Sequence, residues 1–386
     1  MEENRLSFLD GMRGWAALAV YLFHLIIPFR GKFAFTDFYF YQTPLQILLD
    51  GELGIFLFFL ISGFSLSYKF FNTPMPTSNT YLKEAAQYRY FRLLIPIFFA
   101  TLIPYFLTKF HLMYNINAYV GAYSKPFSFA EMVKYTFIEL PFQLSADSGL
   151  FGPIYWTIYL EFTGSFLIFS FLALFGTWNL RFLLYPFILS YLYTLTGIQQ
   201  LYFLFITGVL ICDLFCSLKN NRSLSERSKP SVLKRTGAIA IACALIYLYY
   251  YCVVCKHPIF LSNSRFEFSI LLFVIILTNT SIMHALSSKP SQFLGRISFA
   301  LYLIHFPIFC SLLCFILNFL SQQGYSPINT ALIATGLSSL VVFFVAYLFS
   351  LSVEEQILIK IKIALKKISN MKIQPQPKLI SSNNLN

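Results

Sequence analysis

The sequence contains few charged residues for a chain of 386 residues. Asp, Glu, Lys and Arg make up 11% of it, whereas soluble globular proteins average about 25%. Hydrophobic residues reach 57% of the sequence, and the mean hydropathy is +0.66. This composition excludes an ordinary soluble protein. It predicts an all-α, polytopic protein of the membrane.

Acidic residues are fewer than basic ones, 16 against 28, and the formal net charge is +12. In a soluble chain this excess would suggest binding to nucleic acid. The sequence has no basic patch with interleaved aromatic residues outside the apolar runs, which argues against nucleic acid as a partner. The lysines and arginines are instead typical of cytoplasmic loops that set the topology of a membrane protein.

Cysteine is present but not in a metal-binding pattern, so we expect no metal site. Cys252 and Cys255 have the spacing of a redox pair, but no second cysteine pair or suitably spaced histidine accompanies them. A disulfide between these two is an open alternative. The other pairs stand four residues apart inside apolar runs, which predicts a packing role. They are Cys212/Cys216 and Cys310/Cys314.

Ten apolar runs near twenty residues predict about ten membrane-spanning helices. They cover residues 12–29, 45–70, 93–113, 152–175, 181–196, 200–218, 236–255, 266–283, 296–320 and 329–352. With both termini in the cytoplasm, 21 of the 28 basic residues fall in inner segments and 7 in outer ones, which favours that orientation. We expect a membrane domain over residues 1–355 and a basic, partly disordered cytoplasmic tail over residues 356–386.

The connections add three expectations about the organisation of the chain. The first apolar run has no cleavage pattern after it, so we predict a retained span and not a removable signal peptide. Residues 127–142, in the longest outer connection, predict a short interfacial or re-entrant helix. No internal repeat is evident, so the inverted halves common in transporters find no support.

The first apolar run carries charges at its start and a histidine near its end. At about 3.6 residues per turn and about 1.5 Å of rise per residue, Asp10, Arg13 and His24 share one helix face, with Arg13 and His24 about 16 Å apart along the axis. An ionisable group inside a membrane span is costly and by default functional. We therefore interpret His24 as a functional residue, and the alternative is a structural core histidine.

Arg89 and Arg92 form a second group of charges. They lie three residues apart and so share one face at the start of a predicted helix on the cytoplasmic side. Guanidinium groups suit bidentate binding of phosphate. Together with Arg13 they predict a site for a polyphosphate cofactor such as coenzyme A. The alternative is a pair of charges that only sets the topology.

Carboxylates in the apolar runs form a third group. Glu161 lies inside the run that opens near Trp156, and a carboxylate at that depth needs a partner or a proton. His24 approaches the same depth from the other direction, so we expect the two side chains to meet. The alternative for Glu161 is a structural ion pair. At the end of the tenth run, we expect either Glu354 or Glu355 to pair with an inner arginine.

Two more runs carry polar side chains. Ser62 lies in a glycine-containing run, where small residues let helices approach closely. The other interpretation of Ser62 is a substrate contact or nucleophile. Ser298, Tyr302 and His305 share one face of the ninth run. For His305 a core histidine bonded to a backbone carbonyl is the alternative.

Five of these blocks, taken in order, resemble the acyltransferase family 3 proteins, which are integral-membrane acyltransferases that modify bacterial glycans. The similarity covers roughly residues 5–355. The matching blocks are Leu9–Gly14 with His24 ten residues after Arg13, Phe58–Phe64, Arg89–Arg92, Trp156–Glu161, and Ile297–Pro307. The end of the tenth run departs from the family pattern V-E-x-P, because it reads Val353-Glu354-Glu355-Gln356.

The resemblance implies transfer of an acyl group, usually acetyl, from acyl-CoA to a hydroxyl of a surface or lipid-linked carbohydrate, in a bacterial inner membrane. It implies Arg13, Arg89 and Arg92 as the residues that bind the nucleotide end of the donor. His24 would be the general base, with Glu161 and Asp10 as the other catalytic candidates. Supporting or substrate-contacting roles fall to the remaining candidates, which are Ser62, Trp156, Tyr302 and His305. Direct transfer and an acyl-enzyme on His24 or Ser62 both remain open.

Two rival functions follow from the same residues. Another membrane O-acyltransferase family is built on one histidine in an apolar helix, and His305 is the candidate for that role. A glycan or small-molecule transporter is the non-enzymatic alternative, but it predicts broken helices and charges in two matching halves. Membrane lipid is an expected partner, and the oligomeric state stays open.

Overall fold

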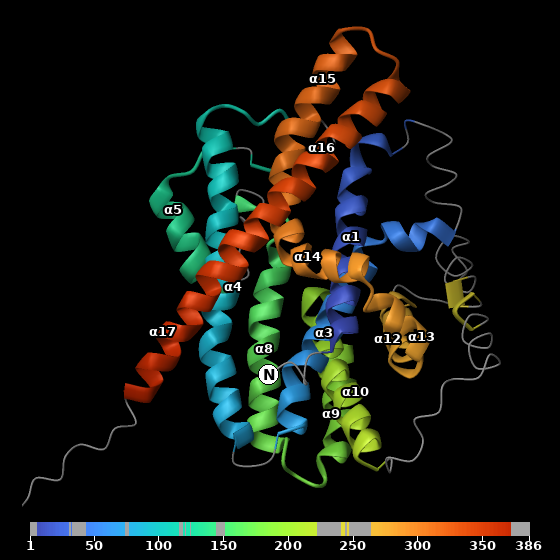
Figure 1. The fold of residues 1–386 in the computed structure, drawn as a ribbon, viewed down its shortest axis with the longest axis vertical. Coiled ribbons are helices and arrows are strands. Elements are labelled where there is room, and N and C mark those ends of the chain that lie inside the picture. The colour runs from blue at the N-terminus through green and yellow to red at the C-terminus, as the bar shows by residue number, and fades with distance from the viewer. Residues whose placement is uncertain are drawn as a thin grey trace, which may run out of the picture.

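A computed structural model describes the chain over residues 6–30, 32, 44–73, 77–115, 119, 121–123, 125–143, 151–221, 241–243, 245–246 and 264–371. These residues form helices joined by turns, and no strand occurs among them (Figure 1). The prediction of an all-α protein is therefore confirmed for this part of the chain. The predicted pair Cys252 and Cys255 lies outside the described residues.

Fourteen of the helical segments are α-helices long or short enough to be placed by label in the order of the chain. They are α1 (Ser7–Leu25), α3 (Gly51–Phe71), α4 (Thr77–Lys109), α5 (Phe129–Lys134), α6 (Leu140–Phe142), α8 (Trp156–Phe175), α9 (Leu184–Thr194), α10 (Tyr202–Asn221), α12 (Ser264–Thr278), α13 (Thr280–Leu286), α14 (Lys289–Ile308), α15 (Cys314–Gln322), α16 (Pro327–Phe349) and α17 (Leu358–Met371). Single-turn 3-10 segments and three π-helical segments connect or extend them. The π-helical segments are η4 (Tyr135–Glu139), η7 (Phe309–Leu313) and η8 (Ser350–Ile357).

Seven helices among the described residues are long and apolar enough to cross a membrane. They are Ser7–Phe29, Gly51–Phe71, Thr80–Lys109, Trp156–Phe175, Gly197–Leu218, Lys289–Gln322 and Pro327–Leu365. Each corresponds to one of the ten predicted spans. The protein is therefore a multi-pass membrane protein, and its surface carries many exposed large apolar side chains, as lipid contact requires.

The other three predicted spans differ from expectation. Over 181–196 the helix α9 has only 11 residues, too few to cross a bilayer alone. Over 266–283 the chain is broken, since α12 and α13 meet at 97°. Asn279 causes this break, because its side chain caps α13 by accepting hydrogen bonds from the amides of Ser281 and Ile282. Most of 236–255 lies outside the described residues.

Local sequence signals account for several helix starts. Asp50 caps α3 by accepting a hydrogen bond from the Leu53 amide at 3.0 Å. In the predicted helix 127–142, Ser128 and Glu131 form a capping box at the start of α5, and helical structure continues through α6. The prediction of a helix at this place is confirmed.

Small residues bring the central helices into close contact. α3 packs against α10 at Gly63 and Gly208, where an added Cβ on either residue would overlap a backbone carbonyl of the other helix. α1 packs against α14 at Gly14 and Gly295 in the same way. Such contacts let membrane helices approach backbone to backbone. The predicted packing role of the glycine-containing run is confirmed at Gly63.

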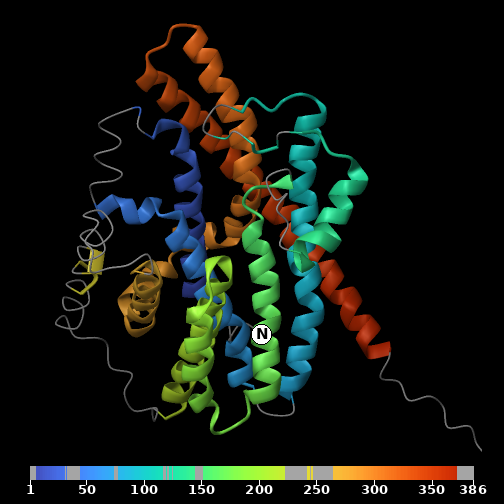
Figure 2. The ribbon, with the colours of Figure 1, turned by 180° about the vertical axis from the view of Figure 1, so that it is seen from behind.

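The packed helices form two hydrophobic cores that share the central helices. Figure 2 shows α8 next to α4, with α9 and α10 packed together on the other side of α8. α15 and α16 form a hairpin that projects at one end of the molecule (Figure 1). The four cysteines predicted to pack are all buried: Cys212, Cys216, Cys310 and Cys314.

The last helix crosses the predicted boundary between membrane domain and tail. α16 continues without a turn through η8 into α17, so helical structure runs past residue 355 to Met371. Leu358 and Ile359, at the start of α17, line the cavity described below. Residues 372–386 lie outside the described part of the chain. The start of the expected tail is therefore an ordered helix attached to the membrane domain.

Candidate active site

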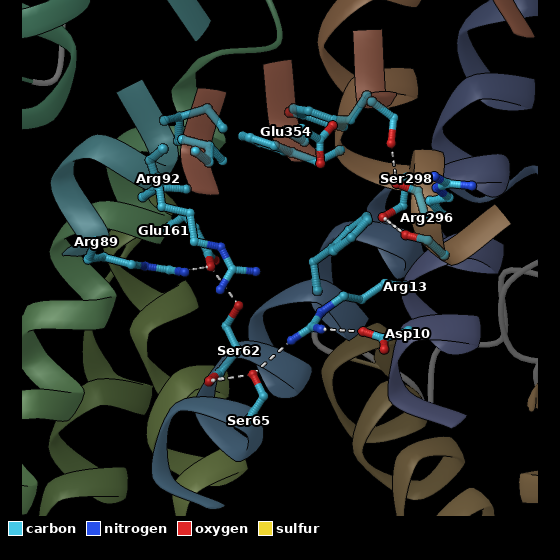
Figure 3. A pocket seen from close by; sticks show the side chains of 18 of the residues that line it. Asp10, Arg13, Ser62, Ser65, Arg89, Arg92, Glu161, Arg296, Ser298 and Glu354 are labelled. Carbon is cyan, nitrogen blue, oxygen red and sulfur yellow. Dashed lines mark hydrogen bonds and ion pairs between the residues drawn. The ribbon is translucent and has the colours of Figure 1, made fainter. Parts of the chain in front are cut away.

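A cavity of about 510 Å³ lies between α1, α3, α4, α8, α14 and η8 (Figure 3). This volume is within the usual range of small-molecule sites. Eight charged side chains line it, four of each sign: Asp10, Arg13, Arg89, Arg92, Glu161, Arg296, Glu354 and Glu355. So many ionisable groups among membrane-spanning helices are costly unless they serve a function.

Arg13 reaches from α1 across to α3. Its Nη1 atom lies 3.1 Å from Oδ1 of Asp10, one turn earlier on the same helix, and its Nη2 atom donates to the hydroxyl of Ser65 at 2.8 Å. These two contacts hold the guanidinium group at the cavity wall. Arg13 is therefore partly neutralised and fixed in position before any ligand binds.

Arg89 on α4 is 7% exposed and pairs with Glu161 on α8 through its Nη2 atom. Its Nε atom donates to the hydroxyl of Ser165 at 2.7 Å. The same carboxylate oxygen of Glu161 accepts from the hydroxyl of Ser62 on α3, at 2.6 Å. Three helices thus meet in one polar network on a wall of the cavity (Figure 3).

Arg92 lies one turn after Arg89 and faces the same cavity. It makes no ion pair or hydrogen bond within the described part of the chain, and it is exposed. Across the cavity, Arg296 forms a bidentate pair with Glu355, at 2.5 Å and 2.7 Å. The expected pairing of Glu354 or Glu355 with an inner arginine is confirmed for Glu355.

Glu354 differs from the other carboxylates of the cavity. Its Oε1 atom is buried and has no hydrogen-bond partner. Arg92 is near enough to interact with it electrostatically. A buried acceptor without a donor is costly, so this oxygen is a ready contact for an N–H or O–H group of a ligand.

Tyr302 and Thr157 close one end of the cavity. The Tyr302 hydroxyl donates to the backbone carbonyl of Ile154 at 2.6 Å and lies 2.5 Å from the hydroxyl of Thr157. Beyond Tyr302, one turn further along α14, lies His305, whose ring centroid is 6.3 Å from that of Tyr302. The cavity therefore ends one side chain short of this histidine.

His305 contacts His24 across the interface between α14 and α1. The Nε2 atom of His305 lies 3.1 Å from Nδ1 of His24. Each Nδ1 atom also lies near the carbonyl four residues earlier on its own helix, Val20 at 2.9 Å for His24 and Leu301 at 2.8 Å for His305. The sequence had suggested a carbonyl partner as the structural alternative for His305. That bond exists, but a second histidine accompanies it.

Comparison with known families decides what kind of protein carries this site. The model of the family described as "Acyltransferase domain" matches residues 6–352, nearly the whole chain. The chain belongs to this acyltransferase family.

A curated relative supports the same class of enzyme for the acyltransferase. The O-acetyltransferase PaAT-1 of Phomopsis amygdali is 26% identical over 372 residues, which cover 78% of this chain and 72% of that protein. No solved structure matches the chain. The enzymatic prediction is therefore confirmed at the level of acyl transfer, and transport is not the activity that the family indicates.

The structure brings most of the predicted site residues of the acyltransferase to one cavity. The residues that line it are Asp10, Arg13, Ser62, Arg89, Arg92, Glu161 and Tyr302. His24 and His305 do not line it but form the pair just beyond Tyr302. Trp156 does not line it either: it begins α8 and packs against a hydrophobic core.

The expected meeting of His24 and Glu161 is wrong. Glu161 bonds to Arg89 and Ser62, whereas His24 bonds to His305 and to its own helix. The estimate of depth along α8 placed Glu161 level with His24. In the structure Glu161 instead shares a wall of the cavity with Arg13, about three helical turns before His24.

Sequence reasoning also missed three residues of the acyltransferase site. Ser65 and Ser165 are the hydroxyl partners of Arg13 and Arg89. Each lies one helical turn after a residue that the sequence had singled out, Ser62 and Glu161, and that spacing was the available signal. The third is the unpartnered oxygen of Glu354, which no sequence pattern reveals.

The described residues do not suggest a metal centre, since no group of three or more His, Cys, Asp or Glu is arranged to hold a metal ion. The cavity does suit an anionic ligand. Arg92 has no carboxylate partner, and Arg13 and Arg89 each keep guanidinium N–H groups beyond those bonded to protein. These donors are of the kind that phosphate groups bind.

Proposed function

We propose that this acyltransferase moves an acetyl group from acetyl-CoA to a hydroxyl of a cell-surface or lipid-linked carbohydrate. Family membership supports acyl transfer. The observation that carries the finer proposal is the cavity itself, which has arginines on its walls and ends beside a histidine pair. The cavity and the pair match the two parts of an acyl-CoA, an anionic nucleotide and a reactive thioester.

In this proposal the nucleotide phosphates bind at the arginines. Arg92 supplies the charge that no protein carboxylate neutralises, and Arg13 and Arg89 supply further N–H donors from fixed positions. Glu354 accepts a hydrogen bond from an N–H or O–H group of the donor. Arg13 and His24 are eleven residues apart on one helix, or about 16 Å, which is of the order of an extended acyl-pantetheine arm.

His24 acts as the general base in the proposed reaction. Its ring takes the proton of the acceptor hydroxyl as the hydroxyl oxygen bonds to the thioester carbonyl carbon. The carbon–sulfur bond then breaks, and the sulfur receives the proton from His24. The products are an O-acetyl ester and free coenzyme A, so atoms and charge balance.

The excess of basic residues in the predicted inner segments supports a cavity that opens to the cytoplasm, where acyl-CoA is made. The resemblance of the motifs to proteins that modify bacterial glycans supports a bacterial inner membrane as the location. The carbohydrate acceptor has the same support. Both are parts of the proposal that the experiment below addresses directly.

The test has two arms. Purified protein in lipid vesicles is given acetyl-CoA labelled in the acetyl group, and release of coenzyme A is measured in the presence and absence of H24A. Surface carbohydrate from cells with and without the protein is then compared by mass spectrometry. We expect coenzyme A release that needs His24, and a difference of one acetyl group per modified unit. Identical carbohydrate masses would overturn the acceptor, and absence of release from acetyl-CoA would overturn the donor.

A further inference from the structure

α1 and α14 run side by side in the same direction and in a fixed register. They touch at Gly14 and Gly295, and the histidines stand ten residues later on each helix, at His24 and His305. The offset between the helices is 281 residues at both contacts, since 295 − 14 and 305 − 24 are equal. Equal offsets mean parallel helices, so the close contact of the glycines sets the meeting of the two rings.

The hydrogen bonds determine which ring nitrogens carry protons. A backbone carbonyl only accepts, so Nδ1 of His24, 2.9 Å from the Val20 carbonyl, is the protonated nitrogen of its ring. The same argument applies to Nδ1 of His305, 2.8 Å from the Leu301 carbonyl. A neutral imidazole has one N–H, so both rings leave Nε2 as the acceptor.

This assignment makes the contact between the rings a hydrogen bond with a direction. Nε2 of His305 accepts from Nδ1–H of His24 at 3.1 Å, and the same N–H is shared with the Val20 carbonyl. The proton of His24 is thus held by two acceptors on the Nδ1 side. Its Nε2 atom keeps a free lone pair, and the ring is partly exposed.

Packing holds His305 in this orientation. The ring is 0% exposed, and the rings of Tyr21 and Phe309 pack against it edge-on, with centroids 6.2 Å and 5.6 Å away. On the other side, Phe23 and Phe306 pack edge-on against His24, at 5.2 Å and 5.3 Å. Aromatic walls of this kind leave neither ring free to flip.

We infer that His305 is a positioning residue, which holds His24 in the tautomer whose Nε2 atom accepts the proton of the acceptor hydroxyl. The inference rests on the proposed role of His24 as the general base. When His24 takes up that proton, its Nδ1–H becomes a stronger donor, and Nε2 of His305 stabilises the resulting imidazolium. His305 therefore takes the place that a carboxylate has in a catalytic triad, without a charge.

Kinetics of three variants test this inference. H305L removes the acceptor and keeps an apolar side chain, and we expect kcat to fall about 100-fold while KM for acetyl-CoA stays within about twofold. H305Q can present an amide oxygen to Nδ1–H of His24, and we expect it to recover at least a tenth of the wild-type kcat. F309L is the matched control, because Phe309 packs on the same ring and makes no hydrogen bond to it.

The comparison among these variants decides between positioning and packing. If H305L loses no more activity than F309L, or if H305Q is as slow as H305L in protein that is equally folded by thermal unfolding, the inference is wrong. Recovery by glutamine together with an unchanged KM would support it, since a purely structural defect would not follow the hydrogen-bond acceptor.

Nuclear magnetic resonance gives a second test that does not depend on activity. In protein labelled with nitrogen-15 at histidine, the ring shifts separate protonated from unprotonated nitrogens, and H24Q and H305Q assign the two rings. We expect Nδ1 protonated and Nε2 unprotonated in both. A proton on Nε2 of His24, with H24A inactive, overturns the inference alone. The expected tautomer with a fully active H24A overturns the proposed function instead.

Discussion

Glu161 accepts hydrogen bonds from Arg89 on α4 and from Ser62 on α3 through one carboxylate oxygen. The pair of Arg89 and Glu161 joins two long helices at the wall of the cavity, where Arg89 is almost completely buried. Neither charge is tolerable there without the other, because a buried ion that loses its partner keeps its full desolvation cost. Glu161 is thus first a partner for an arginine, and only through it part of the site.

The first prediction concerns this pair. E161Q leaves Arg89 as an uncompensated buried charge, so we expect the free energy of unfolding to fall by about 3–5 kcal/mol. The double variant R89Q/E161Q removes both charges and should recover a large part of that loss. Chemical unfolding in detergent measures both, and the double-mutant cycle isolates the pair. Equal stability of E161Q and wild type would show that the pair does not contribute.

The second prediction compares two arginines of the cavity. R92Q removes the guanidinium group that has no carboxylate partner, and we expect KM for acetyl-CoA to rise about 10- to 100-fold, as loss of a charge-assisted hydrogen bond implies. R296Q is the matched control, since Arg296 also lines the cavity but is already paired with Glu355. We expect it to change KM less than about threefold. Equal effects of the two variants would contradict a special role for Arg92.

The third prediction concerns His24 alone. H24A removes the proposed general base, and we expect kcat to fall by about 10²–10⁴-fold while the protein still inserts and unfolds at a similar temperature. Binding of coenzyme A, measured by calorimetry, should change little because the arginines are intact. Acetyl transfer by H24A at the wild-type rate would remove His24 from the mechanism.

The fourth prediction concerns the contact between α3 and α10. A Cβ on Gly63 would overlap the backbone carbonyl of Phe205, so G63A must push the helices apart. We expect a loss of about 1–3 kcal/mol in the free energy of unfolding, as overpacking of a tight interior costs. G336A is the control, because nothing lies within 4 Å of a Cβ added at Gly336 on α16. A melting temperature of G63A as high as that of G336A would contradict the close packing.

The sequence alone was sufficient for the class of protein and for the composition of the site. Long apolar runs require helices in a membrane, and most of the predicted runs are such helices. The rare charges inside those runs were the right residues to examine, since a bilayer penalises each of them. Arg13, Arg89 and Arg92 do share one cavity. Periodicity failed where local chemistry broke a run, as Asn279 does between α12 and α13.

The partner of each site residue was decided only by the tertiary structure. Helical periodicity gives the direction of a side chain around its own helix, but not which neighbouring helix lies in that direction or at what height. Glu161 meets Arg89 because α4 and α8 are adjacent, and His24 meets His305 because Gly14 and Gly295 bring α1 and α14 together in parallel. Both histidines follow those glycines by ten residues, but the equal spacing has a meaning only once the two backbones are in contact.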